Sequence, residues 1–442
     1  MPSHRNDSGN GEKIGAPSLW SWFQLIILVL IAIGFFNIYS STFYMNLENG
    51  VNPYKHVISH AIYCILGLGI FYIVYKLPLS LWRRFAFIVA LITFILLVGV
   101  FLFGRTVNGA TRWIGFGAIS LQPSEIAKVA AVLWASSRLA SRMEKGKLLA
   151  LFALPKWLGK RIRGQMDGLA RGSFHSMMGA YTPLTAPLLF AVMIMEQPDM
   201  GTAALVLGFP VLLYLFCGSS IIEILWTLIV AVIGFFGLAL LEPYRWERVR
   251  VLWDPFSHAS NEGYQTVQSL IAVGSGGFFG QGAGEGLSKF LYLPEQHTDF
   301  AYAVLSQEGG FMIAGMVLLL YGALLVVGFL MARRITDIFP ALLVYGLTML
   351  IGVEGLLNIA MVIGSFPVTG VPLPFISFGG SSLVMNLFSI GLIGNAVRYG
   401  ERIRLREERQ RKLDTLGGYP ESLQQISGAV FRPSSDDRLK RY

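Results

Sequence analysis

The chain has 442 residues, of which 54% are hydrophobic and only 14% are charged, and its mean hydropathy is +0.58. Soluble domains carry about 25% charged residues, so this composition excludes an ordinary soluble protein and indicates a membrane protein. The formal net charge is +9. Nucleic acid is excluded as a partner, because the basic residues cluster beside apolar segments, where they orient the chain and contact anionic lipid. Cys64 and Cys217 lie inside apolar segments without a partner at metal or disulfide spacing, so both are expected to be small buried residues.

A polar N-terminal tail at 1–17 precedes ten apolar segments, each close to the ~20 residues that a helix needs to cross a bilayer. The segments cover residues 19–46, 56–77, 82–103, 121–138, 182–196, 201–218, 220–241, 300–332, 338–364 and 377–397. The sequence therefore predicts an all-α polytopic membrane protein, with about ten transmembrane helices in a membrane domain at 18–397.

Lys and Arg distinguish the two sides of the membrane. They are concentrated after the second, fourth and eighth segments, most densely in the basic loop 139–181, and again in the C-terminal tail 398–442. If this side is cytoplasmic, both termini are cytoplasmic as well. The large loop 242–299, between the seventh and eighth helices, then faces outward and is the first place to look for function. No matching pair of interrupted helices is visible in two halves, which counts against an inverted-repeat transporter.

The outward loop offers several candidate sites. Arg245 and Arg248 lie among aromatic residues; guanidinium groups suit phosphate oxygens, but this composition favours an interfacial belt. Residues 264–271 have helical apolar spacing and predict a short helix, either lying in the interface or packed within the loop. Seven glycines lie within 274–286. No soluble βαβ unit surrounds them, so they do not predict a nucleotide loop; they permit tight turns or a close approach of backbone to a ligand or lipid.

Asp299 ends this loop directly before the eighth helix, and two roles fit it. Thr298 or Asp299 would make a good N-cap for that helix, which is the more usual function of such residues at this position. Alternatively, Asp299 is a carboxylate at the membrane surface that acts as a general base. The sequence alone favours the cap and leaves the base open.

Two pairs of polar residues at helical spacing lie inside predicted membrane helices. Glu125 and Lys128 are spaced i,i+3 in the fourth helix, and Glu354 and Asn358 are spaced i,i+4 in the ninth. A charge in lipid costs roughly 2.5–3.5 kcal/mol on insertion scales, so these side chains should face the bundle interior and find partners. A paired Glu125 and Lys128 would most simply hold helices together.

Three prolines in 365–376 prevent a regular helix there and predict the wall of an outward cavity.

In combination, several motifs resemble the SEDS family (shape, elongation, division and sporulation), represented by FtsW, RodA and SpoVE. The matching segments run in family order at 109–114, 122–125 with Lys128, 197–202, 254–255, 263–277, 293–300 and 367–382. Segments 264–270 and 282–294 look more like the division type, FtsW, whereas 295–297 and 367–370 look more like the elongation type, RodA. The sequence as a whole is more similar to FtsW.

The resemblance implies a peptidoglycan glycosyltransferase that polymerises lipid II on the outer face of the bacterial cytoplasmic membrane, in septal wall synthesis. Asp299 would be the family's essential aspartate, removing the proton from the acceptor GlcNAc 4-hydroxyl as this attacks the donor's anomeric carbon with inversion. Trp113 matches a functionally important tryptophan, and Arg112 beside it would meet pyrophosphate. The other expected substrate contacts are Arg245, Arg248, Lys289, His297, Ser377, Gly379 and Gly380. The expected structural or cavity-lining residues are Glu125, Lys128 and Glu354.

The resemblance also implies a class B penicillin-binding protein as transpeptidase partner, together with other membrane proteins of the divisome or elongasome. No cluster of metal-ligating residues predicts a fixed metal site, while a divalent cation, Mg²⁺ or Mn²⁺, bridging the phosphates is compatible with the chemistry. Three alternatives stay open: an elongation-type polymerase, a lipid II flippase that uses the charges inside the membrane as a polar path, and a non-catalytic scaffold.

Overall fold

The structure of the chain is a computed structural model. It describes residues 18–107, 110–116, 119–146, 180–219, 221–240, 250–259, 263–286 and 293–415.

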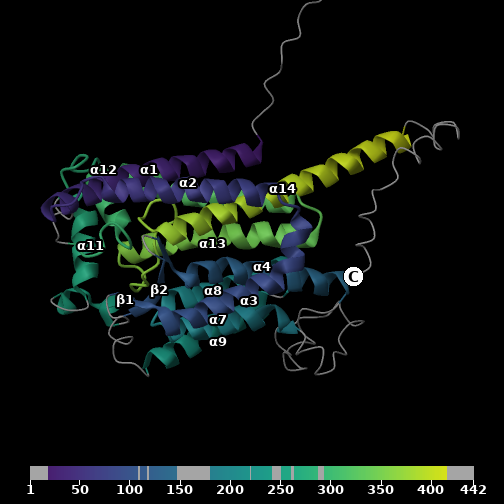
Figure 1. Ribbon diagram of the computed structural model, residues 1–442, viewed down its shortest axis with the longest axis horizontal. Coiled ribbons are helices and arrows are strands. Elements are labelled where there is room, and N and C mark those ends of the chain that lie inside the picture. Colours follow the sequence, from purple (N-terminus) through teal and green to yellow (C-terminus); the bar gives the residue numbers. More distant parts are fainter. Residues whose placement is uncertain are drawn as a thin grey trace, which may run out of the picture.

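Long helices lie side by side and form one bundle (Figure 1). Their bounds are α1 Leu19–Glu48, α2 Lys55–Lys76, α3 Leu79–Phe103, α4 Pro123–Glu144, α7 Thr185–Met195, α8 Met200–Phe216, α9 Ile221–Leu240, α12 Ala301–Arg333, α13 Ile338–Val362 and α14 Gly380–Thr415. Within the described ranges, six of them (α1, α2, α3, α12, α13 and α14) are long and apolar enough to cross a membrane. The predicted helical, multi-pass membrane fold is confirmed; the number of crossings stays a prediction.

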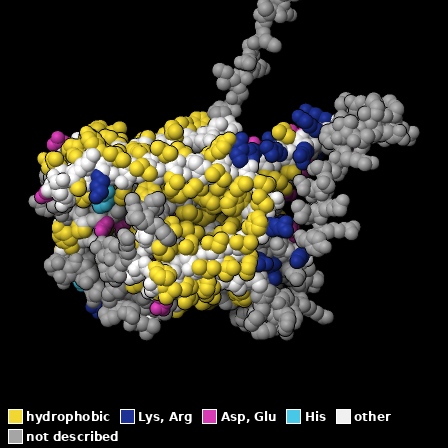
Figure 2. All heavy atoms as spheres, viewed as in Figure 1, with side chains coloured by type: hydrophobic (Ala, Val, Ile, Leu, Met, Phe, Trp, Pro, Cys, Tyr) yellow, Lys and Arg dark blue, Asp and Glu magenta, His cyan; other side chains and the backbone are white. Residues whose placement is uncertain are grey.

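The two ends of the bundle differ in their charge. Hydrophobic side chains cover its flank, whereas Lys and Arg gather at the end where α14 leaves the bundle (Figure 2). The opposite end, which we call the outward end, carries the strands β1 and β2 and the helix α11, Tyr264–Ser275 (Figure 1). Basic residues mark the cytoplasmic side of membrane proteins, so this distribution supports the predicted orientation.

The last helix is longer than the sequence predicted. It continues to Thr415 rather than ending at 397, and so includes the first part of the expected C-terminal tail. The added segment is rich in Arg, Glu and Leu, which are strong helix formers, and an ion pair of 3.4 Å joins Arg404 to Glu408 one turn away. Hydropathy identifies only the apolar part of a helix, which explains the early predicted end.

A small antiparallel sheet forms at the outward end, where the sequence predicted only a loop. Its strands are β1 Arg105–Val107, β2 Ala110–Phe116 and β3 Ile119–Leu121, in that spatial order. Trp113 of β2 pairs with Arg105, and Ile114 pairs with Leu121. Successive residues of a strand point to opposite faces, so Arg112 and Trp113 face different sides of the sheet.

The predicted short helix of the outward loop is present as α11, which lies across the end of the bundle (Figure 1). The Ser269 hydroxyl donates a hydrogen bond of 2.7 Å to the carbonyl of Val362, at the end of α13. α11 is therefore attached to the bundle and is not a free interfacial helix.

Helix α12 is broken at Gly310, whose φ of 63° and ψ of −169° are not helical. Segment 277–282 of the outward loop lies against 307–312 at this break. The break removes the helical hydrogen bonds between two N–H groups after it and two carbonyls before it. The two N–H groups donate to loop carbonyls instead, and the two helix carbonyls accept from loop N–H groups. These bonds are Phe311 N to Gly277 O, Met312 N to Phe278 O, Gln281 N to Gln307 O and Gly282 N to Glu308 O, at 2.9–3.2 Å. The loop thus replaces two helical hydrogen bonds, as a break near a membrane requires.

Gly280 of this loop allows two stretches of the chain's own backbone to approach each other closely. A Cβ on Gly280 would collide with the carbonyl of Glu308, and Gly280 has φ +83°. Gly277 also has a positive φ, +55°, but a Cβ there would meet nothing within 4 Å. Alanine substitutions at these two positions therefore distinguish the cost of backbone strain alone from the cost of strain together with a steric collision.

We expect Gly280→Ala to lower the free energy of unfolding by about 2–5 kcal/mol, because left-handed strain and overpacking act together. Gly277→Ala should cost only the strain, about 1–2 kcal/mol. Thermal unfolding of both variants in detergent measures the difference. Equal losses would show that the close contact between loop and helix does not stabilise the protein.

Candidate functional site

Asp299 is not the N-cap residue of α12. The N-cap position is Phe300, whose side chain makes no capping hydrogen bond. The Thr298 hydroxyl donates instead to the carbonyl and the carboxylate of Glu295, at 3.2 and 2.8 Å. The N-cap predicted at Thr298 or Asp299 is therefore wrong in position, because the helix begins after Phe300.

The Asp299 carboxylate and the Arg112 guanidinium both lie beside Gly370. A Cβ placed on Gly370 would lie 3.6 Å from Asp299 Oδ2 and 4.0 Å from Arg112 Nη1. Gly370 has φ +70°, so glycine suits its backbone and also keeps the space between the two charged groups open. The structure thus brings together a carboxylate and a cation from segments far apart in the sequence, beside the proline-rich segment 365–376.

Arg112 is held rigidly by backbone carbonyls. Its Nε donates to the carbonyl of Gln197 at 3.0 Å, and its Nη2 donates to the carbonyl of Pro198. The next residue, Asp199, caps α8 by accepting a hydrogen bond from the Thr202 N–H at 3.2 Å. These contacts fasten strand β2 to the turn between α7 and α8. They use two of the three guanidinium nitrogens and leave Nη1 as the one nearest Gly370.

Asn358 ties Asp299 to the proline-rich segment. It is fully buried in α13, and its side-chain amide donates hydrogen bonds of 2.8 Å to the carbonyls of Asp299 and Val371. One amide group therefore fixes the backbone of Asp299 relative to the loop that carries Gly370. The sequence showed Asn358 only through its spacing from Glu354.

We expect Asn358→Leu to reduce the activity of the folded protein at least about tenfold, since a misplacement of about 1 Å can cost up to about 10²-fold. Two buried carbonyls also lose their donor, at about 1–3 kcal/mol each. Asn395→Leu is the matched control, because the Asn395 amide bonds the carbonyls of Val74 and Leu77 at 2.8 and 2.6 Å in the same way. It should lose comparable stability and keep its activity per folded molecule. Equal losses of activity would mean that Asn358 is only structural.

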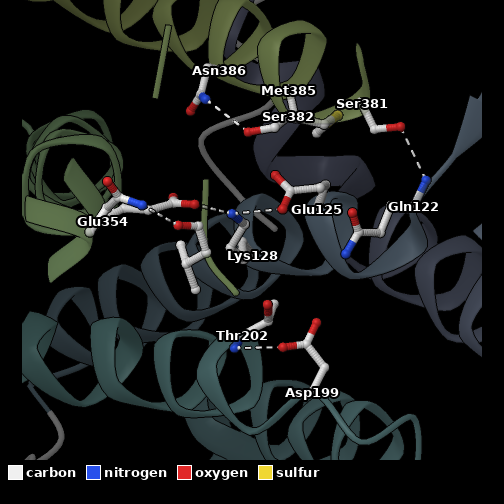
Figure 3. Close-up of polar contacts among 12 residues, drawn as sticks. Gln122, Glu125, Lys128, Asp199, Thr202, Glu354, Ser381, Ser382, Met385 and Asn386 are labelled. Atoms are coloured by element: carbon white, nitrogen blue, oxygen red, sulfur yellow. Dashed lines mark hydrogen bonds and ion pairs between the residues drawn. The ribbon is translucent and has the colours of Figure 1, made fainter. Parts of the chain in front are cut away.

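A buried charge cluster includes Glu354, which lies one turn before Asn358 in α13. Lys128 Nζ is 3.0 Å from Glu125 Oε1 and 2.5 Å from Glu354 Oε1, and all three side chains are buried (Figure 3). The prediction that these residues face the interior and pair is confirmed. The cluster joins α4 to α13, whereas the sequence linked only Glu125 and Lys128.

Serines connect the start of α14 to the small sheet. The Ser381 hydroxyl donates to the carbonyl of Ser120 at 3.0 Å. It also accepts from the Gln122 N–H at 3.1 Å (Figure 3). Ser377 is buried, and its hydroxyl accepts from the Leu373 N–H at 2.9 Å. Ser377 therefore shapes the turn that leads into α14, and substrate contact by it stays a prediction.

Gly379 and Gly380, at the start of α14, were also expected to contact substrate. A Cβ on Gly380 would lie 2.5 Å from the ring of Tyr63, so this glycine allows α2 and α14 to pack closely. A Cβ on Gly379 would lie at an ordinary distance of 3.4 Å from Ser382. The packing accounts for Gly380, while Gly379 stays a predicted contact.

His297 packs among other rings. Its ring centroid lies 5.3 Å from that of His56 and 5.9 Å from that of Phe378, and its carbonyl accepts from the Phe378 N–H at 2.8 Å. Burial lowers the pKa of His297, although the carboxylate of Glu295 acts in the opposite direction. The imidazole is therefore neutral at pH 7, and any contact it makes with a phosphate is a hydrogen bond without charge.

Strained backbone conformations occur in the turns that lead to the site residues. Glu295 and Phe375, described non-glycine residues, have positive φ values of 52° and 68°. Each lies next to a segment that forms the site: the turn before Asp299 and the turn before Ser377. Such strain costs about 1–3 kcal/mol per residue and is concentrated at functional sites.

The other predicted residues are placed incompletely or not at all. Trp113 is half-buried on β2. Arg245, Arg248 and Lys289 lie outside the described residues. Sequence reasoning missed Gly370 and the carbonyls of Gln197 and Pro198. A glycine and two backbone carbonyls carry no ionisable group, so only their place within the matching motifs could have pointed to them.

Comparison with known proteins identifies relatives along most of the chain. The family profile described as "Cell cycle protein", for FtsW, RodA and SpoVE, matches residues 21–402. The chain is 34% identical to the probable peptidoglycan glycosyltransferase FtsW of Coxiella burnetii, over 85% of this chain and 95% of that protein. It is 32% identical to stage V sporulation protein E of Bacillus subtilis, over 85% and 96%.

Solved structures share the fold. A chain from a peptidoglycan synthase complex, described for its structural coordination of polymerization and crosslinking, matches with a TM-score of 0.63 at 24% identity, over 86% of this chain and 97% of that one. The rod shape determining protein RodA of Thermus thermophilus matches with a TM-score of 0.58 at 23% identity, over 86% and 96%.

Proposed function

Since the chain belongs to the FtsW, RodA and SpoVE family of cell cycle proteins, we propose that it is a peptidoglycan glycosyltransferase that polymerises lipid II. Several relatives above 30% identity, aligned over most of their length, are named as glycosyltransferases of the division type, FtsW. Their names support a role in septal wall synthesis. The charge distribution supports a bacterial cytoplasmic membrane protein with both termini inside the cell and its site outside.

One observation carries the proposal: Asp299 Oδ2 and Arg112 Nη1 both lie within about 4 Å of one point above Gly370, at the outward end of a membrane bundle. A lipid-linked sugar pyrophosphate approaches from the membrane and is already activated, so the reaction needs no nucleotide outside the cell. Pyrophosphate leaves without protonation, and a single carboxylate acting as base can then suffice, where ordinary glycosidases use two.

In the proposed reaction, Asp299 accepts the proton of the acceptor's GlcNAc 4-hydroxyl. The hydroxyl oxygen forms a bond to the anomeric carbon of the donor chain, and the bond from that carbon to the pyrophosphate oxygen breaks, with inversion. Arg112 offsets the negative charge on the leaving pyrophosphate. Asn358 holds the backbone of Asp299 in place through its hydrogen bond to that carbonyl.

Two further components are part of the proposal. In the described part of the chain, no group of three or more His, Cys, Asp or Glu could hold a metal ion. We propose that Mg²⁺ or Mn²⁺, where used, is bound by the substrate's pyrophosphate, whose oxygens are suitable ligands for either ion. The solved complex that joins polymerization to crosslinking supports a class B penicillin-binding protein, a transpeptidase, as partner, alongside other membrane proteins of the division machinery.

Purified chain with a class B transpeptidase, supplied with lipid II in detergent micelles, tests the proposal. A polymerase forms glycan strands there, resolved by gel electrophoresis. A flippase forms none, because micelles offer no second compartment, and a scaffold also forms none. Absence of strands with and without divalent cation, from protein that still binds its partner, would reject the proposal.

A further inference from the structure

Large apolar side chains project outward where the outward loop meets the break in α12. Phe278, Phe279, Phe311 and Met312, which we call the aromatic wedge, are 57%, 79%, 67% and 53% exposed. The Phe278 ring centroid lies 4.9 Å from that of Phe279 and 5.9 Å from that of Phe311. The wedge is thus a continuous surface built from two segments of the chain.

The wedge is held rigidly in this exposed arrangement. The four backbone hydrogen bonds between 277–282 and 307–312 fix its two halves to each other and to the bundle. Gly280 and Gly310 permit this approach, since a Cβ on either would meet the opposite backbone. The aromatic side chains therefore cannot turn inward without breaking the junction.

Helix α12 gives the depth of the wedge relative to the membrane. From Phe311 to Arg333 the helix is continuous and rises by roughly 33 Å at 1.5 Å per residue. This length matches the hydrocarbon core of a bilayer, about 30 Å. Arg333 and Arg334 are exposed at the basic end of the bundle, where the inner headgroups would lie. Phe311 then lies at the outer edge of the hydrocarbon, and its backbone bonds place Phe278 and Phe279 at a similar depth.

The polarity of the neighbouring residues changes at this depth. Ile271, on the preceding α11, is also exposed, and it extends the apolar surface along the end of the bundle. Beyond the wedge, Gln281 and Glu285 are exposed and polar. An apolar strip followed within a few residues by a polar one is typical of a segment at the boundary between acyl chains and headgroups.

We propose that the aromatic wedge inserts into the outer leaflet of the bilayer and anchors the outward loop to the membrane surface. Acyl chains and headgroups of the lipid cover the four side chains. The anchor keeps the loop, and with it the turn before Asp299, at a fixed height above the membrane. This inference depends on the orientation of the chain and not on its enzymatic activity.

Spin labels test the anchor in the full chain reconstituted into phospholipid nanodiscs, after Cys64→Ala and Cys217→Ser remove the native thiols. A nitroxide is attached at Phe279→Cys, and its accessibility to oxygen, which concentrates in lipid, is compared with that to a water-soluble nickel chelate. Leu319→Cys, on the exposed face of α12 within the membrane span, is the lipid reference, and Ala283→Cys, exposed in the polar part of the loop, is the water reference.

We expect the label at 279 to resemble that at 319, with oxygen accessibility several-fold above that of the nickel chelate, and the ratio to be reversed at 283. A label at Phe311→Cys, on the other half of the wedge, should give the same result if the 279 variant does not fold. High nickel accessibility at 279 would place the wedge in water and overturn the proposal. Shielding from both reagents would show that protein covers it, which would also overturn it.

Discussion

Asp299→Asn is expected to lower the rate of glycan strand formation at least about 10²-fold, the smaller of the usual contributions of a general base. The substituted amide has nearly the shape of the carboxylate but does not accept a proton at neutral pH. The backbone carbonyl that receives the Asn358 hydrogen bond is unchanged, so the free energy of unfolding should change by less than about 1 kcal/mol. Strand formation from lipid II and thermal unfolding of the same preparation separate the two effects.

Glu285→Gln is the matched control for this substitution. Glu285 is an exposed carboxylate in the same outward loop, remote in sequence from the turn that carries Asp299. Removing its charge changes the net charge of the loop equally and should leave the rate within about twofold, as for a surface substitution of about 0.5 kcal/mol or less. If Asp299→Asn retains the wild-type rate, Asp299 is not the base, and the proposed mechanism fails while the family assignment stands.

The transmembrane helices were predictable from the sequence because each is defined by its own apolar residues. The predicted segments for α1, α2 and α3 agree with the observed helices within a few residues. The break at Gly310 was not predictable in this way. It depends on backbone hydrogen bonds to segment 277–282, which no local pattern encodes. The strands of the small sheet were missed for the same reason, since their pairing is a contact between segments.

The candidate site was predictable where chemistry requires an ionisable group. Asp299 was chosen from its place in the outward loop and Arg112 from the resemblance to the family, but their common position beside Gly370 depends on the tertiary fold. The N-cap interpretation failed because a local turn competes with it: the Thr298 hydroxyl and the N–H groups of Thr298 and Phe300 all bond back to Glu295. Residues that suit a helix cap also suit such turns, and the sequence does not distinguish the two.

Lys128→Met should have the largest effect on stability. The ammonium lies between the carboxylates of Glu125 and Glu354, and its removal leaves two buried carboxylates without their counter-charge. Losing one partner of a buried ion pair costs about 3–5 kcal/mol. Arg83→Met is the control, because Arg83 and Glu144 form a partly exposed ion pair of 2.6 Å at the basic end of the bundle. It should cost about 1 kcal/mol or less. Thermal unfolding in detergent compares the two.

The combined replacement Glu125→Gln, Lys128→Met and Glu354→Gln decides what the cluster does. A buried cluster replaced as a whole by neutral side chains of similar size is often close to neutral in stability, because no uncompensated charge remains. We therefore expect the triple variant to recover most of the stability lost in Lys128→Met and to form strands at a rate near that of the wild type per folded molecule. If the cluster served as a polar path for a transported headgroup, the folded triple variant would lose its activity. If the cluster only joins α4 to α13, the folded triple variant would keep it. A stable but inactive triple variant would therefore contradict a purely structural role.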